Sequence, residues 1–137
     1  MFPDNLWGEL PSVDEVRTPN MILSEQAAKL GELTRNILRG EVSQVSDVAP
    51  GFFAYALDIV APVLDDFRVT VLRVSHALAL YPVAVEDPFD DSPGWDEIPT
   101  PECQSQEEFV GLVRRILGSR AVHGVIANLL AQSRAVK

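Results

Sequence analysis

Between Thr18 and Gly40 the apolar positions recur three or four residues apart, which is the spacing of one face of an α-helix. The members of this stripe are Ile22, Leu23, Ala27, Leu30, Ile37 and Leu38. Thr18 supplies a hydroxyl that can cap the first turn, Pro19 suits the first helical position, and Gly40 is a typical stop. The pattern predicts a helix within residues 18–40.

After residue 41 the apolar positions alternate, which is the period of a half-buried strand. In the first run, one face carries Phe53, Tyr55, Leu57 and Ile59. In the second run, one face carries Leu72, Val74, His76, Leu78 and Leu80, and the other carries Val69, Val71, Arg73, Ser75 and Ala77. A short acidic turn joins the two runs, so the segment is typical of an antiparallel hairpin. With the turn at Leu64 and Asp65, residue 57 pairs with 72 and residue 55 with 74.

Two shorter segments flank the hairpin. Residues 42–48 precede the break expected at Pro50 and Gly51 and form an additional candidate strand. Residues 81–85 are a candidate continuation of the sheet on the other side. The number of strands therefore stays open between two and four.

The C-terminal part returns to helical spacing. Ser105 followed by Glu108 matches a capping box, and Gly118 marks the end of the first helix. Ser119 can cap a second helix. The two apolar stripes are Phe109, Leu112, Val113, Ile116 and Leu117, then Val122, Val125, Ile126, Leu129 and Leu130.

Together these elements predict one α+β domain over residues 1–137, a length that suits a single domain. Its antiparallel sheet is built on the long hairpin, with one helix before it and two after it, in the order α–β–β(–β)–α–α. The expected segments are a helix at 18–40, antiparallel strands at 42–85, an acidic proline-rich loop at 86–104 and a helical pair at 105–132.

The net charge of −9 is concentrated in one part of the chain. Between Val74 and Val113 there are nine acidic residues and no Lys or Arg, whereas the remainder has eleven of each sign. A localised charge creates a potential in one direction, which favours a basic partner. No basic stripe is present to neutralise phosphates, so nucleic acid is not an expected partner.

The single cysteine, Cys103, excludes an intrachain disulfide and suits a reducing compartment. The longest apolar run, residues 50–64, is interrupted by Asp58 and by prolines and is shorter than the roughly 20 residues of a membrane-spanning helix. We therefore expect a cytoplasmic protein with no membrane contact.

Residues 86–102, EDPFDDSPGWDEIPTPE, hold seven of the carboxylates, four prolines and no basic residue. The prolines forbid regular structure, and a long loop in a compact domain is usually functional or disordered. Either the aromatic residues only pin this loop onto the domain, or the loop also docks a basic partner. We hypothesise docking, in the manner of an inhibitor, immunity-type protein or accessory subunit, through Asp90, Asp91, Trp95, Asp96 and Glu97.

The second face of the sheet is too apolar for a fully solvated surface. It carries Phe52, Ala54, Ala56, Val69 and Val71. Either a helix of the same chain covers this face or a second copy of the protein does, as a homodimer. A homodimeric structural domain is therefore the alternative to a partner-binding domain.

The sequence offers little support for a catalytic site. Cys103 lies among Glu102, Glu107 and Glu108, which raise a thiol pKa and disfavour a reactive thiolate. His76 belongs to the apolar face of its strand and His123 lies off the helical stripe. No zinc-ligand spacing, calcium-loop pattern or glycine-rich phosphate loop occurs, so neither a metal nor a cofactor is expected.

Asp58 interrupts an apolar strand and lies diagonal to Arg73 in the expected register, which predicts a cross-strand ion pair. A small hydrolase-like enzyme that uses His76 with Asp58 or a loop carboxylate is the remaining alternative. The alternation places His76 and Asp58 on opposite faces, which argues against that pair.

Overall fold

The structure is a computed structural model that describes residues 6, 8–9, 17–46, 48–89 and 101–136. Its elements are, in order, α1 (Pro19–Leu33), β1 (Arg39–Val45), β2 (Phe52–Ala61), the 3-10 turn η2 (Pro62–Leu64), β3 (Phe67–Ala77), β4 (Val83–Glu86), β5 (Glu102–Cys103), α2 (Gln106–Leu117) and α3 (Arg120–Val136). The strands form one open antiparallel sheet in the order β1-β2-β3-β4-β5. The predicted α+β class and element order are confirmed, and the two-residue strand β5 adds a fifth strand to the four expected at most.

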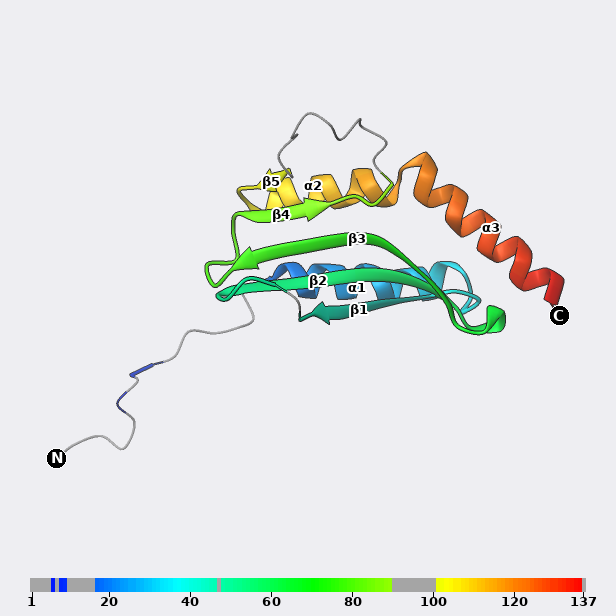
Figure 1. The fold of residues 1–137 in the computed structure, drawn as a ribbon, viewed down its shortest axis with the longest axis horizontal. Coiled ribbons are helices and arrows are strands. Elements are labelled where there is room, and N and C mark those ends of the chain that lie inside the picture. Colours follow the sequence, from blue (N-terminus) through cyan, green and yellow to red (C-terminus); the bar gives the residue numbers. More distant parts are fainter. Residues whose placement is uncertain (1–5, 7, 10–16, 47, 90–100, 137) are drawn as a thin grey trace.

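The helices α1 and α2 lie against one face of the sheet, and α3 extends toward the start of β3, where it contacts the turn η2 (Figure 1). The core lies between these helices and the sheet. Its fully buried members include Leu23, Leu72, Val85 and Phe109. The other face of the sheet carries no helix among the described residues, and we call it the open face (Figure 1).

The first helix ends at Leu33, seven residues before the expected limit at residue 40. Arg35 and Asn36 adopt left-handed backbone angles, with φ of 53° and 65°, so the chain turns out of the helix after Thr34. The Thr34 hydroxyl lies 2.9 Å from the Leu30 carbonyl oxygen and accepts a hydrogen bond from the Leu38 N–H at 3.2 Å. Because asparagine tolerates this conformation, the turn forms without the glycine that the sequence pattern relied on.

The central hairpin has the expected register, with Leu57 opposite Leu72 and Tyr55 opposite Val74. Beyond Leu57 a β-bulge makes Val71 an extra residue, so Asp58 lies opposite Thr70. One extra residue reverses the facing of every side chain beyond it. Val69 and Val71 therefore point to the helix side, and their expected place on the second face is wrong.

The same bulge changes the ionic partner of Asp58. The expected pair with Arg73 is wrong, because Arg73 lies opposite Ala56. Arg68 is the partner, with its Nη1 at 3.3 Å from Asp58 Oδ2. The expected kind of contact, a cross-strand ion pair, is present.

The predicted caps of the C-terminal helices are confirmed. The Ser105 hydroxyl accepts from the Glu108 N–H at 3.2 Å, and the Ser119 hydroxyl accepts from the Val122 N–H at 3.2 Å. The Glu108 carboxylate in turn accepts from the Gln104 N–H, one residue before the position of a standard capping box. The segment expected as a loop at 86–104 begins with the last residue of β4, Glu86, and contains the whole of β5, which pairs with β4.

Candidate functional site

Asp90, Asp91, Trp95, Asp96 and Glu97, the residues predicted to dock a partner, lie outside the described residues. The described residues nearest to them in the sequence flank this segment on both sides. These are the end of β4, the strand β5 and the first turn of α2.

Five carboxylates gather on these flanks, and we call them the acidic edge: Glu86, Asp87, Glu102, Glu107 and Glu108. The pairing of β4 with β5 brings residues far apart in sequence to the same margin of the sheet, with Ala84 opposite Glu102. The helix α2 begins directly after β5, so its acidic first turn lies at the same margin. Four of the five residues are exposed and Asp87 is half-buried.

A hollow of about 320 Å³ adjoins the acidic edge. Its lining is Val85, Asp87, Pro101, Leu112, Arg115, Ile116 and Ser119. The apolar side chains of Leu112 and Ile116 come from α2, and Asp87 and Pro101 border residues 90–100. Asp87 is the member of the acidic edge that lines this hollow, and Arg115 places a cation in the same lining.

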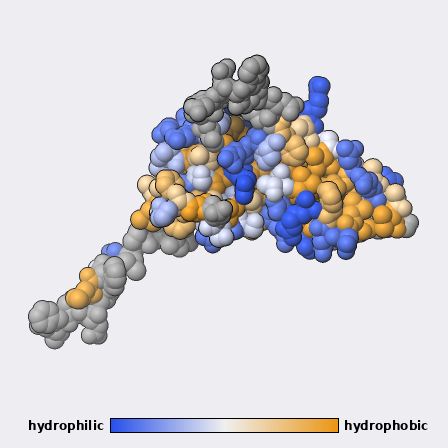
Figure 2. All heavy atoms as spheres, viewed as in Figure 1, coloured by the Kyte–Doolittle hydropathy of each residue, from blue (hydrophilic) through white to orange (hydrophobic). Residues whose placement is uncertain are grey.

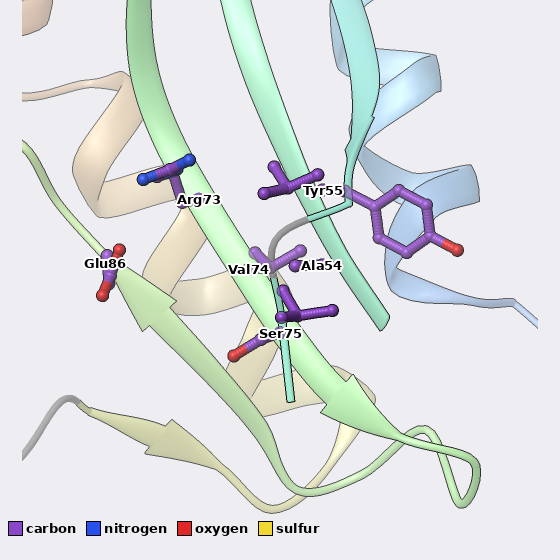
Figure 3. Close-up of a pocket in the computed structure, with 8 residues that line it drawn as sticks. Ala54, Tyr55, Arg73, Val74, Ser75 and Glu86 are labelled. Atoms are coloured by element: carbon purple, nitrogen blue, oxygen red, sulfur yellow. The ribbon is translucent and has the colours of Figure 1, made fainter. Parts of the chain in front are cut away.

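The open face next to β4 is polar. Arg73 on β3 and Glu86 on β4 lie opposite each other, with Ala54 and Ser75 beside them, while Tyr55 points away from this face toward α1 (Figure 3). These residues border a shallow hollow of about 190 Å³. The acidic edge is thus continuous with the open face through Glu86.

A second polar group on the open face joins three strands. The Asp58 carboxylate is buried and accepts a hydrogen bond from the Thr70 hydroxyl at 2.6 Å. Arg68 pairs with Asp58 and also with Glu41, at 2.7 Å, and the hydrogen bond to Asp58 raises the pKa of Arg68. Because Arg68 links Asp58 to Glu41, and Thr70 donates to Asp58, this group ties the strands β1, β2 and β3 together and stabilises the sheet.

The open face is more polar than the sequence pattern indicated. Ala54, Ala56 and Val60 are buried, yet no described helix covers them. Arg39 and Arg68 flank Val60 on the two neighbouring strands, and the stems of such long side chains shelter small apolar residues. Figure 2 shows hydrophilic and hydrophobic residues mixed on the side in view, with the largest hydrophobic area toward α3 and the hairpin turn. Homodimerisation through Phe52, Ala54 and Ala56 stays a prediction.

Cys103 is a buried free thiol on β5, opposite Val83. Burial raises its pKa, and Glu108 raises it further, while Arg115 acts in the opposite direction. The direction is the one expected from the sequence. The main cause is burial, which the sequence did not reveal.

The two histidines differ in solvent exposure. His123 is exposed on α3, whereas His76 is 5% exposed and lies between the rings of Phe53 and Tyr55. His76 pairs with Phe53 on the helix side of the sheet, and Asp58 belongs to the open face, so the two cannot share a proton. In the described parts of the chain, no three His, Cys, Asp or Glu side chains are grouped to hold a metal ion.

Comparison with protein-family models, with curated proteins and with solved structures gave no match. None of the helices in the described ranges is long and apolar enough to cross a lipid bilayer. The fold and the site together define an open-sheet α+β domain with one acidic edge.

Proposed function

We propose that this protein is a small cytoplasmic binding domain without catalytic activity, which docks a basic partner protein through the acidic edge and residues 90–100. The observation that carries the proposal is the charge distribution. The entire net charge of −9 resides between Val74 and Val113, and the rest of the chain is neutral. The described acidic residues of that segment lie at the end of β4, on β5 and in the first turn of α2.

The physical basis is electrostatic complementarity with an apolar anchor. A one-sided negative potential accelerates the encounter with a basic surface and suppresses wrong partners. The hollow beside Leu112 and Ile116 supplies apolar contact that charge alone does not provide. An inhibitor, an immunity-type protein or an accessory subunit of a basic enzyme would use such a surface.

The test compares two variants of equal net charge. The first neutralises the predicted contact residues through Asp90→Asn, Asp91→Asn, Asp96→Asn and Glu97→Gln. The control neutralises four exposed acids on other elements through Glu25→Gln, Glu32→Gln, Asp65→Asn and Asp66→Asn. Each variant changes the net charge by four units, from −9 to −5.

The three proteins are immobilised and exposed to lysate of the source cells at low and high salt, and a captured protein is then purified for affinity measurements. We expect a basic partner that binds the wild type and the control, and binds the first variant at least tenfold more weakly at low salt. Equal weakening in both variants would mean that net charge alone matters. Equal binding by all three would remove the proposal.

The variant Trp95→Ala tests the contribution of the aromatic side chain to the affinity separately from that of the carboxylates. An aromatic hot spot contributes about 2 kcal/mol or more, so the affinity should fall roughly thirtyfold. The dependence of affinity on salt should remain that of the wild type, because no charge is removed.

A further inference from the structure

A second hollow, of about 320 Å³, lies on the helix side of the sheet, where α1 begins. We call it the aromatic hollow, and its lining is Thr18, Asn20, Phe53, Tyr55, His76, Leu78 and Leu80. It shares no residue with the acidic edge or with the hollow beside it. None of its seven side chains is a carboxylate, an ammonium or a guanidinium group, so the lining suits an uncharged ligand.

Three rings form one wall of the aromatic hollow. The ring centroids of Phe53 and His76 are 5.7 Å apart and their planes are inclined by 29°. Phe53 is directly opposite His76 in the strand pairing and Tyr55 is diagonal to it, with its ring centroid 6.1 Å from that of His76 and its plane inclined by 27°. Rings at this spacing and inclination are stacked with an offset, the arrangement that aromatic groups favour. Because Phe53 is 37% exposed, part of its ring remains open to a further planar group.

The imidazole of His76 is the unusual member of this wall. Its Nδ1 lies 2.6 Å from the carbonyl oxygen of Ala77. A carbonyl oxygen only accepts, so Nδ1 carries the proton, and in the neutral ring Nε2 is left as an acceptor. No described residue pairs with Nε2, and this atom is not among the fully buried unpaired side-chain atoms, so it remains open to the hollow although His76 as a whole is only 5% exposed. An acceptor that is open on a wall of stacked rings can receive a hydrogen bond from a ligand that lies against those rings.

The side chains on the opposite wall leave room for such a donor to enter with an apolar body. Thr18 already uses its hydroxyl to cap α1, by accepting from the Met21 N–H at 3.1 Å. Leu78 is 82% exposed and stands at the rim. A volume of about 320 Å³ is at the low end for ligand pockets, which favours a small ligand.

We propose that the aromatic hollow binds a small, uncharged, planar aromatic molecule that donates one N–H or O–H hydrogen bond to Nε2 of His76. The rings of Phe53 and Tyr55 provide the stacking surface, and Leu78 and Leu80 cover the apolar edge of the ligand. This site is independent of partner docking and does not rest on the proposed function.

The experiment uses the full chain and two probes, indole and 1-methylindole, which share the same rings and differ in the N–H donor. Binding is followed by the backbone amide NMR signals during titration. We expect saturable shifts at Phe53, Tyr55 and Leu78, and an affinity for indole at least fivefold higher than for 1-methylindole. The His76→Phe variant keeps a stacked ring without the acceptor, and it should bind the two probes equally.

A measurement on the wild type protects the test against a variant that fails to fold. The ring nitrogen signals of His76 should show the Nδ1–H tautomer without ligand, and the Nε2 signal should shift with indole but not with 1-methylindole. The absence of saturable shifts near His76 would overturn the proposal, and so would equal affinity of the wild type for both probes. Shifts confined to other surfaces, or a hollow that accepts neither probe because another part of the chain fills it, would do the same.

Discussion

Gly40 allows a sharp test of how α1 packs on the sheet, because propensity and structure predict opposite signs for Gly40→Ala. Glycine in a strand is less stable than alanine by roughly 0.5–1 kcal/mol, so propensity alone predicts a gain. The structure predicts a loss. A Cβ atom at Gly40 would lie 2.5 Å from Cα of Ala27 and 2.8 Å from its carbonyl oxygen.

The size of the loss follows from these distances. Ordinary contacts begin at 3.4 Å, so α1 must move away from β1 by about 0.9 Å. A gap of that size forfeits a quarter to a half of each dispersion contact that Ile22 and Leu23 make beneath the helix. Overpacking of this kind costs about 1–3 kcal/mol, and subtracting the propensity gain of about 0.5–1 kcal/mol leaves a net loss of about 1 kcal/mol at the middle of the two ranges.

The assay is urea unfolding followed by circular dichroism, with wild type, Gly40→Ala and a matched control. Gly111→Ala is the control, because Gly111 lies on an exposed position of α2 with nothing within 4 Å of its added Cβ. The control should gain about 0.8–1 kcal/mol. Adding Ala27→Gly to Gly40→Ala should restore little stability, because the closest clash is with the backbone. A Gly40→Ala protein as stable as the wild type, with an unchanged urea slope, would refute this account of the packing.

Three further predictions concern buried polar groups. Asp58→Ala should lower the free energy of unfolding by about 1–3 kcal/mol in urea titrations, because the Thr70 hydroxyl loses its acceptor; a change below about 0.5 kcal/mol would contradict this. Burial raises the pKa of Cys103 above its ordinary value of 9.0, so the folded state holds its proton longer than the unfolded state, and stability should fall as the pH rises above about 9. Cys103→Ala should make that fall shallower, and identical slopes would show that the thiol does not contribute. Tyr81→Phe should leave the melting temperature equal or higher, since the buried Tyr81 hydroxyl has no partner in the described ranges; a marked decrease would reveal a bond to it.

The fold class was accessible from the sequence because the period of its apolar residues differs between elements. Leu57 and Leu72 belong to alternating runs, and the acidic turn between the runs placed them opposite each other. The bulge at Val71 was not accessible, because neither glycine nor proline marks it and both side-chain patterns remain apolar across it. The shift it causes moved Val69 to the helix side and exchanged Arg73 for Arg68 as the partner of Asp58.

The end of α1 shows a second limit of pattern analysis. The stripe continues through Leu38, which is fully buried, so the periodicity gave no reason to stop the helix. The chain nevertheless turns at Thr34, because the threonine hydroxyl replaces helical hydrogen bonds and Asn36 accepts a left-handed backbone. Local side-chain bonds of this kind compete with the helix and are not visible in a hydrophobic period.

The aromatic hollow could be predicted from the sequence only in part. Alternation placed His76, Phe53 and Tyr55 on one face, and the hairpin register made His76 and Phe53 neighbours, so the ring stack was derivable. A lone histidine on an apolar face is usually a core residue with both nitrogens satisfied, and the face alone cannot distinguish that case from a binding site. The distinction depends on the second nitrogen. Nδ1 is satisfied by the carbonyl oxygen of Ala77, and the ring borders the aromatic hollow. The unpaired Nε2 therefore makes His76 a candidate ligand contact.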